Sequence, residues 1–131
     1  MSYEMRLLAD DSILLTTFHA DFSVAAEAPQ LMAEMKQVLD AAPGPLTMLD
    51  DLLSLKMSFG DMVSGLAMAT RGDFAMARHP NVRKLVIVST NDLLRLGGNA
   101  LKQAQYGGVQ TDIYPTLEEA INGIRGELAG V

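Results

Sequence analysis

The sequence has 131 residues, of which 49% are hydrophobic and 20% charged, and its formal net charge is −6. This composition excludes a disordered chain, and the length predicts a single domain over residues 1–131 with its own core. The acidic balance argues against general nucleic-acid binding. Because the apolar runs are short, we expect no membrane span, no signal peptide and a cytoplasmic protein.

Residue types that carry much of enzyme chemistry are scarce. There is no cysteine, which excludes disulfides, thiolate catalysis and zinc–thiolate sites. The two histidines, His19 and His79, are far apart in the sequence and too few for most metal sites. Gly97-Gly98 does not fit a nucleotide-binding glycine pattern. We therefore expect no metal, no cofactor and no enzymatic activity.

The chain begins with a predicted hairpin and a helix. Tyr3–Leu8 and Ile13–Phe18 predict two strands joined by a short polar turn. Apolar residues at helical spacing then run from Ala28 to Leu39, and we expect Pro29 in the first turn of this helix.

The middle of the chain predicts a strand followed by a long helix. Leu46–Leu49 reads as a short buried strand that ends in Asp50-Asp51. Leu52–Met57 fits either a loop or a continuation of the strand. A helix rich in methionine and alanine is predicted over Phe59–Arg78, and His79-Pro80-Asn81 ends it.

The last part alternates strands and helices. Leu85–Val88 predicts a strand buried on both faces, Asp92–Tyr106 a helix, and Val109–Tyr114 a strand. Thr116 followed by Glu119 is a capping box that opens the final helix. This order predicts an α/β domain with a mostly parallel sheet preceded by an antiparallel first strand.

Two stretches of the C-terminal half form a recognisable pattern: Asn81–Val88, and Val109–Tyr114 running into a Thr-Leu-Glu-Glu-Ala helix start. Together with the element order, they resemble the penultimate strand and the ending of the STAS fold, and more closely of the SpoIIAA-like group of small bacterial proteins. The resemblance implies a STAS/SpoIIAA-like fold and a regulatory role. Most members of the SpoIIAA-like group have no assigned biochemical role.

STAS domains of the anti-anti-sigma type carry Asp-Ser-Ser-Gly-Leu, in which a serine is phosphorylated. Here Ser64-Gly65-Leu66 matches, whereas the paired serine is missing and Asp61 stands one position too early. Ser64 is thus the acceptor that the resemblance favours. Ser58 is the better helix cap because Asp61 follows three residues later. If phosphate regulates the protein, Ser58 or Ser64 accepts it; otherwise both are cap and first-turn residues.

Ligands of open α/β sheets sit beyond the carboxyl ends of the strands. Polar residues predicted there are His19, Asp21, Asp50, Asp51, Ser54, Lys56, Ser58, Ser89, Thr90, Asn91 and Asp92. Asp50 and Asp51 would suit a cation or a shared proton, but neighbours on a strand point to opposite faces. The alternative is a polar strand end with Lys56 as a loose partner. Ser89-Thr90-Asn91-Asp92 would suit a phosphate or a metal, or else Thr90 or Asn91 caps the next helix.

Two further clusters admit a structural or a docking role. Arg71, Arg78, Arg83 and Lys84 form a basic group that fits an acidic partner or an ordinary helix C-terminus. Met57, Met62, Met68 and Met76 fall in or just before the Phe59–Arg78 helix, where core packing competes with an adaptable groove.

The sequence therefore predicts a non-enzymatic regulatory or protein-interaction module. The alternative is a domain that binds a small apolar ligand or lipid. Expected partners are another protein or a second copy of the chain, with Phe59–Arg78 at a homodimer interface, because its apolar residues cover more than one face. We expect neither nucleic acid nor a membrane as partner.

Overall fold

The computed structural model describes residues 2–8, 10, 12–56, 58, 60–61, 64, 79–92, 95–96 and 110–129. The helices predicted over Phe59–Arg78 and Asp92–Tyr106 lie mostly outside these residues. The elements are β1 (Tyr3–Leu8), β2 (Ile13–Phe18), α1 (Val24–Ala41), β3 (Leu46–Asp51), β4 (Val82–Val88), β5 (Thr111–Tyr114) and α4 (Leu117–Ala129).

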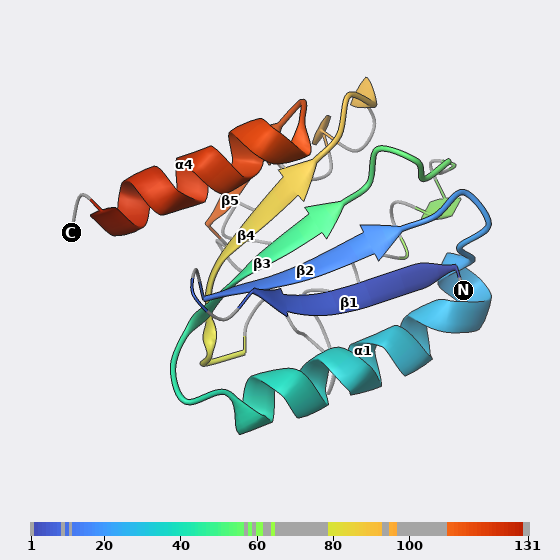
Figure 1. The fold of residues 1–131 in the computed structure, drawn as a ribbon. Helices are drawn as coiled ribbons and strands as arrows, with labels where there is room; N and C mark the ends of the chain where they lie inside the picture. Colours follow the sequence, from blue (N-terminus) through green and yellow to red (C-terminus); the bar gives the residue numbers. More distant parts are fainter. Residues whose placement is uncertain are drawn as a thin grey trace.

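The strands form one mixed sheet in the order β1-β2-β3-β4-β5 (Figure 1). β1 is antiparallel to β2, and all later neighbours are parallel. This confirms the predicted α/β class with an antiparallel first strand. The turn between β1 and β2 is too short for a crossover, and Ser12 closes it with a φ of 54°.

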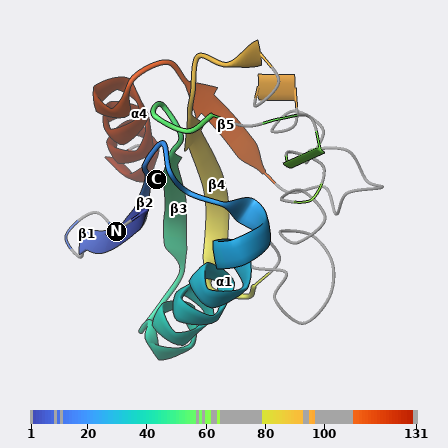
Figure 2. The same ribbon diagram turned by 90° about the vertical axis from the view of Figure 1, so that its right-hand side faces the viewer.

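α1 covers one face of the sheet and α4 the other (Figure 2). Side chains from alternate strand positions pack under each helix, so the central strands β3 and β4 are buried on both faces. The α1 face has its core at Leu14, Phe18, Leu31, Met35, Leu39, Leu46, Met48, Leu85 and Ile87. The α4 face has its core at Ile13, Leu49, Val86, Val88, Ala120 and Ile124.

α1 begins earlier than its apolar period indicates. The Ser23 hydroxyl accepts a hydrogen bond from the Ala26 N–H (3.3 Å), and the Glu27 carboxylate accepts one from the Ser23 N–H (3.1 Å). This reciprocal cap starts the helix at Val24. Pro29 therefore lies in the second turn, not in the first turn as predicted.

β3 and β4 are longer than predicted because backbone pairing continues past the apolar runs, whereas β5 is shorter. β3 includes Asp50 and Asp51, which pair in register with Ile87 and Val88 of β4. β4 starts at Val82, where the register with β3 shifts. β5 starts two residues later than predicted, at Thr111.

Candidate functional site

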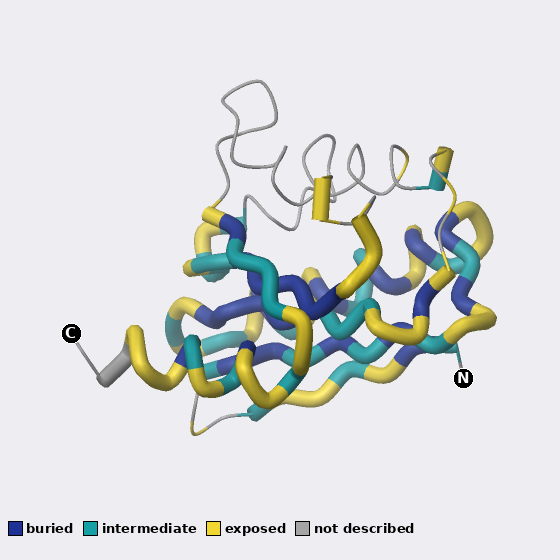
Figure 3. Tube along the Cα trace, turned by 90° about the horizontal axis from the view of Figure 1, so that it is seen from above, coloured by how far each residue is buried: buried dark blue, intermediate teal, exposed yellow. Residues whose placement is uncertain are grey.

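The arrowheads of β2, β3 and β4 in Figure 1 meet at one edge of the sheet. Asp50 and Asp51 close β3 at this edge, and Ser89 directly follows β4. The exposed residues in Figure 3 lie in the loops and along the helices, whereas the central strands are largely buried. We call these strand ends, together with the described residues among 52–61 and 89–96, the carboxyl edge.

The two aspartates of β3 lie on opposite faces of the sheet, as the strand alternation predicts. Asp50 continues the α1-facing series of Leu46 and Met48, and Asp51 continues the series of Leu49. Asp51 Oδ1 accepts a hydrogen bond from the Leu53 N–H at 3.1 Å. The two carboxylates therefore do not converge on a common cation.

Asp50 has a different environment from Asp51. Its Oδ1 atom is buried and has no hydrogen-bond partner within the part of the chain that the structure describes. Burial raises the pKa of the Asp50 carboxyl group to about 7. Thr16, its register partner on β2, also has a buried hydroxyl without a partner.

Ser58 and Asp61 form the capping pair that their spacing predicts. The Ser58 hydroxyl accepts a hydrogen bond from the Asp61 N–H (3.1 Å), and Asp61 Oδ2 accepts one from the Ser58 N–H (3.5 Å). Ser58 and Ser64 are both exposed. A phosphate on Ser58 would displace this cap and stand beside the Asp61 carboxylate, which opposes it.

The segment after β4 forms a turn around Ser89. Ser89 is buried, its N–H donates to the Tyr114 carbonyl group of β5, and its hydroxyl accepts from the Asn91 N–H at 3.0 Å. The Asn91 carbonyl group accepts from the Arg95 N–H, also at 3.0 Å. Ser89 and Asn91 thus order this end of the sheet, and Ser89 contributes no exposed hydroxyl.

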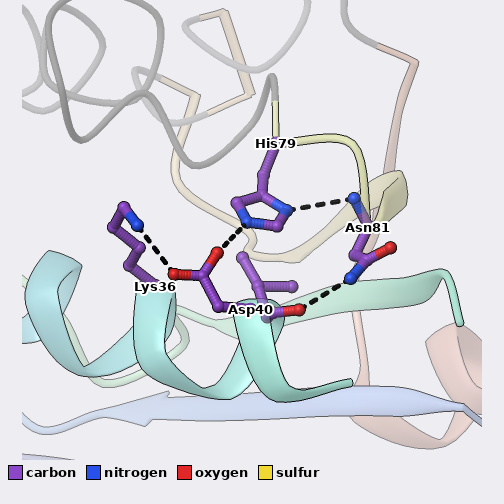
Figure 4. Close-up of polar contacts among 5 residues, drawn as sticks. Lys36, Asp40, His79 and Asn81 are labelled. Atoms are coloured by element: carbon purple, nitrogen blue, oxygen red, sulfur yellow. Dashed lines mark hydrogen bonds and ion pairs between the residues drawn. The ribbon is translucent and has the colours of Figure 1, made fainter. Parts of the chain in front are cut away.

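A second polar network joins the C-terminus of α1 to the start of β4 (Figure 4). The Asn81 N–H donates to His79 Nδ1 at 3.0 Å, so His79 carries its proton on Nε2, which lies 2.7 Å from Asp40 Oδ1. Hydrogen bonds from Lys36 and His79 lower the pKa of Asp40. Both ring nitrogens of His79 are therefore occupied, and the pair is suited to fastening α1 rather than to base catalysis.

This His79–Asp40 contact has no signal in the sequence, because 39 positions separate the two residues. The Nε2 atom of the other histidine, His19, lies 3.5 Å from a carboxylate oxygen of Glu4 on β1.

Two members of the predicted basic cluster have internal partners. Arg83 donates to the Thr47 hydroxyl at 2.6 Å, and Lys84 contacts the carboxylates of Asp112 and Glu127. Burial acts to lower the pKa of Lys84, but these two carboxylates outweigh it and the pKa is raised. Lys84 therefore joins β4 to β5 and α4. Arg71, Arg78 and the four methionines lie outside the described residues.

No group of three or more metal-ligating side chains occurs within the described ranges. In that same part of the chain, no helix has the length and apolar character needed to cross a membrane.

Comparison with known proteins supports the fold. The sequence matches no protein-family model and no curated protein. Among solved structures, it is similar to an uncharacterised protein of the DUF3478 family from Shewanella loihica PV-4, which has a SpoIIAA-like fold. The similarity covers 93% of this chain and 91% of that one, with a TM-score of 0.57 and 12% sequence identity. The chain thus has the SpoIIAA-like fold that its element order and its C-terminal third predict.

Proposed function

We propose that the protein is a non-enzymatic regulatory or protein-interaction module that binds its partner at the carboxyl edge. The observation that carries this proposal is the presence of two exposed leucines there. Leu53 is 46% exposed in the loop after β3, and Leu96 is 61% exposed after β4. Large apolar side chains exposed at one edge are typical of a contact surface.

Local hydrogen bonds hold Leu53 in this exposed position. The Leu53 N–H donates to Asp51, and the Leu55 N–H donates to the Leu52 carbonyl group at 3.1 Å. The turn buries Leu55 in the core and turns Leu53 outward. A backbone that is already held by hydrogen bonds has less conformational entropy to lose on binding, which favours a docking role.

The polar residues of the edge support a binding role over catalysis. Asp51, Ser58 and Ser89 each accept a hydrogen bond from the backbone. Across the described residues, none of these serine hydroxyls pairs with a histidine or a lysine, the partners that would activate a nucleophile.

The test introduces a negative charge at the edge. Wild-type protein, Leu53→Glu, Leu96→Glu and Leu7→Glu are immobilised and exposed to extract of the native host, and retained proteins are quantified by mass spectrometry. Leu7 is the matched control, because it is 51% exposed on β1, away from this edge. We expect a protein retained by wild type and by Leu7→Glu, and lost from both edge variants.

Equal retention by all four proteins would contradict the proposal. Co-purification of a small apolar molecule with the wild-type protein, without a protein partner, would instead favour the alternative of a ligand-binding domain.

A further inference from the structure

Two buried side-chain oxygens on neighbouring strands lack hydrogen-bond partners among the described residues: Thr16 Oγ1 and Asp50 Oδ1. Thr16 and Asp50 are register partners in the parallel pair β2–β3. Both lie on the sheet face that α1 covers, since Leu14 and Phe18 flank Thr16 there and Met48 precedes Asp50. Paired strands are about 4.8 Å apart, so the two side chains stand next to each other.

Buried polar groups in folded proteins normally have a partner, so a neighbouring pair of unsatisfied oxygens needs an explanation, and a ligand group that pairs with both is one. Thr16 is 0% exposed. Asp50 is of intermediate burial as a residue, whereas its Oδ1 atom is buried. The pair thus places two unsatisfied buried oxygens at the end of β3, on a residue that keeps some contact with solvent.

The residues around Thr16 and Asp50 indicate which kind of ligand group would suit the pair. The neighbours along and across the strands are apolar: Phe18, Met48 and Ile87. Burial alone raises the pKa of Asp50, without a contribution from another charged group. Near this edge the described residues include the carboxylates of Asp21, Asp51, Asp61 and Asp92, against the cations Lys56 and Arg95 and the imidazole of His19.

We propose that Thr16 and Asp50 form a subsite for the ammonium group of a lysine side chain presented by a protein partner. The inference rests on the proposed function and names the chemistry of that partner. An ammonium group has three donors on one compact atom, which suits one carboxylate oxygen and one hydroxyl better than a planar guanidinium does. A net charge of −6 favours a basic partner, and the apolar walls suit the aliphatic stem.

The test uses n-butylammonium chloride, which reproduces the lysine side chain. Aspartate carboxyl carbons are observed by NMR in the full chain while the salt is added to about 100 mM, a range suited to a weak fragment. We expect a saturable shift of the Asp50 resonance and a lower apparent pKa of Asp50. Thr16→Val should weaken binding about tenfold, as expected for the loss of one hydrogen bond to a charged group.

Two controls separate the subsite from general effects. Asp51→Asn, altered at the same strand end but on the opposite face, should bind n-butylammonium like the wild type, whereas Asp50→Asn should not bind it. An Asp50 response of equal size to tetramethylammonium, which has the charge without a donor, would overturn the proposal. So would an equal response to n-butanol, unchanged binding by Thr16→Val, or no response.

The outcome is distinguishable from failure of the proposed function. If the edge variants lose a partner but n-butylammonium does not bind, the lysine subsite alone is refuted. If n-butylammonium binds but the edge variants retain every partner, docking at the carboxyl edge is refuted and the lysine assignment falls with it.

Discussion

The Asp50 carboxyl group links the stability of the fold to pH. Burial raises its pKa from 3.8 to about 7, so the folded chain holds a proton that the unfolded chain has released. A raised carboxyl pKa means that stability decreases as the pH rises from about 4 to about 7, and levels off above that range. The ionised form of the Asp50 carboxyl group is thus less favourable to folding than its protonated form.

Replacement of Asp50 by asparagine should remove this pH dependence. From about pH 5.5 to about pH 8.5, the free energy of unfolding of the wild type should fall by about 2 kcal/mol relative to that of Asp50→Asn. Urea unfolding at the two pH values measures it. Asp51→Asn removes a charge at the same strand end, and an equal difference for that variant would attribute the effect to net charge instead of burial.

At the scale of single residues, the sequence predicts the orientation of a side chain where the local strand geometry determines it. The opposite orientation of Asp50 and Asp51 follows from strand alternation alone. The orphaned Thr16 hydroxyl was missed, although it has a signal: a threonine stands between Leu14 and Phe18 on an otherwise apolar face of β2. Whether a buried oxygen finds a partner depends on side chains from other strands, which the sequence does not place.

Within α4, two glycines should respond in opposite ways to alanine. A Cβ atom on Gly123 would lie 2.7 Å from Cζ of Tyr114, whose ring packs against the α4-face core, whereas one on Gly126 would meet nothing within 4 Å. We expect Gly126→Ala to stabilise the protein by about 1 kcal/mol through helix propensity. Gly123→Ala should destabilise it by about 1 kcal/mol or more, because the crowding exceeds that gain.

Thermal or urea unfolding of the two variants provides the measurement, and each serves as control for the other because both make the same change in one helix. Equal stabilisation by both would show that the Tyr114 ring moves aside without cost, and would contradict the tight packing of β5 against α4.

The start of α4 is predictable from the sequence because its cap has a recognisable pattern. Thr116 does accept a hydrogen bond from the Glu119 N–H, at 3.2 Å, and α4 begins directly after it. At α1 the apolar period does not predict where the helix starts, because the cap at Ser23 precedes it. The Ser23 hydroxyl accepts from the Ala26 N–H and the Glu27 carboxylate accepts from the Ser23 N–H, a signal that periodicity does not contain.

At the scale of the whole molecule, alternation of strands and helices was enough for the α/β class and the direction of β1. The strand order follows the chain order, so each parallel crossover joins nearest neighbours, which is the simplest arrangement for such a sequence. The contacts that fasten the elements were not predictable. Lys84 with Asp112 and Glu127, and His79 with Asp40, join positions far apart in the chain.

The assembly state is the remaining prediction at this scale, and it is a homodimer with Phe59–Arg78 at or beside the interface. The segment lies outside the described residues, so the argument is one of sequence: Met62, Ala69 and Met76 repeat every seven positions, while Leu66 and Phe74 fall elsewhere around a helix. A helix with two apolar faces packs one of them against the sheet of its own chain. The other apolar face then has to be buried against a second chain.

Light scattering at high micromolar concentration should give twice the mass of the chain. Ala69→Glu places a charge in the repeated line and should shift the protein to monomer without unfolding it. Leu7→Glu, on the edge strand β1, should leave the dimer intact, because it alters an exposed leucine away from the predicted interface. A wild-type monomer would contradict the dimer itself. Dissociation by Leu7→Glu alone would instead move the interface to β1, whose outer edge has unpaired backbone groups suited to strand pairing between copies.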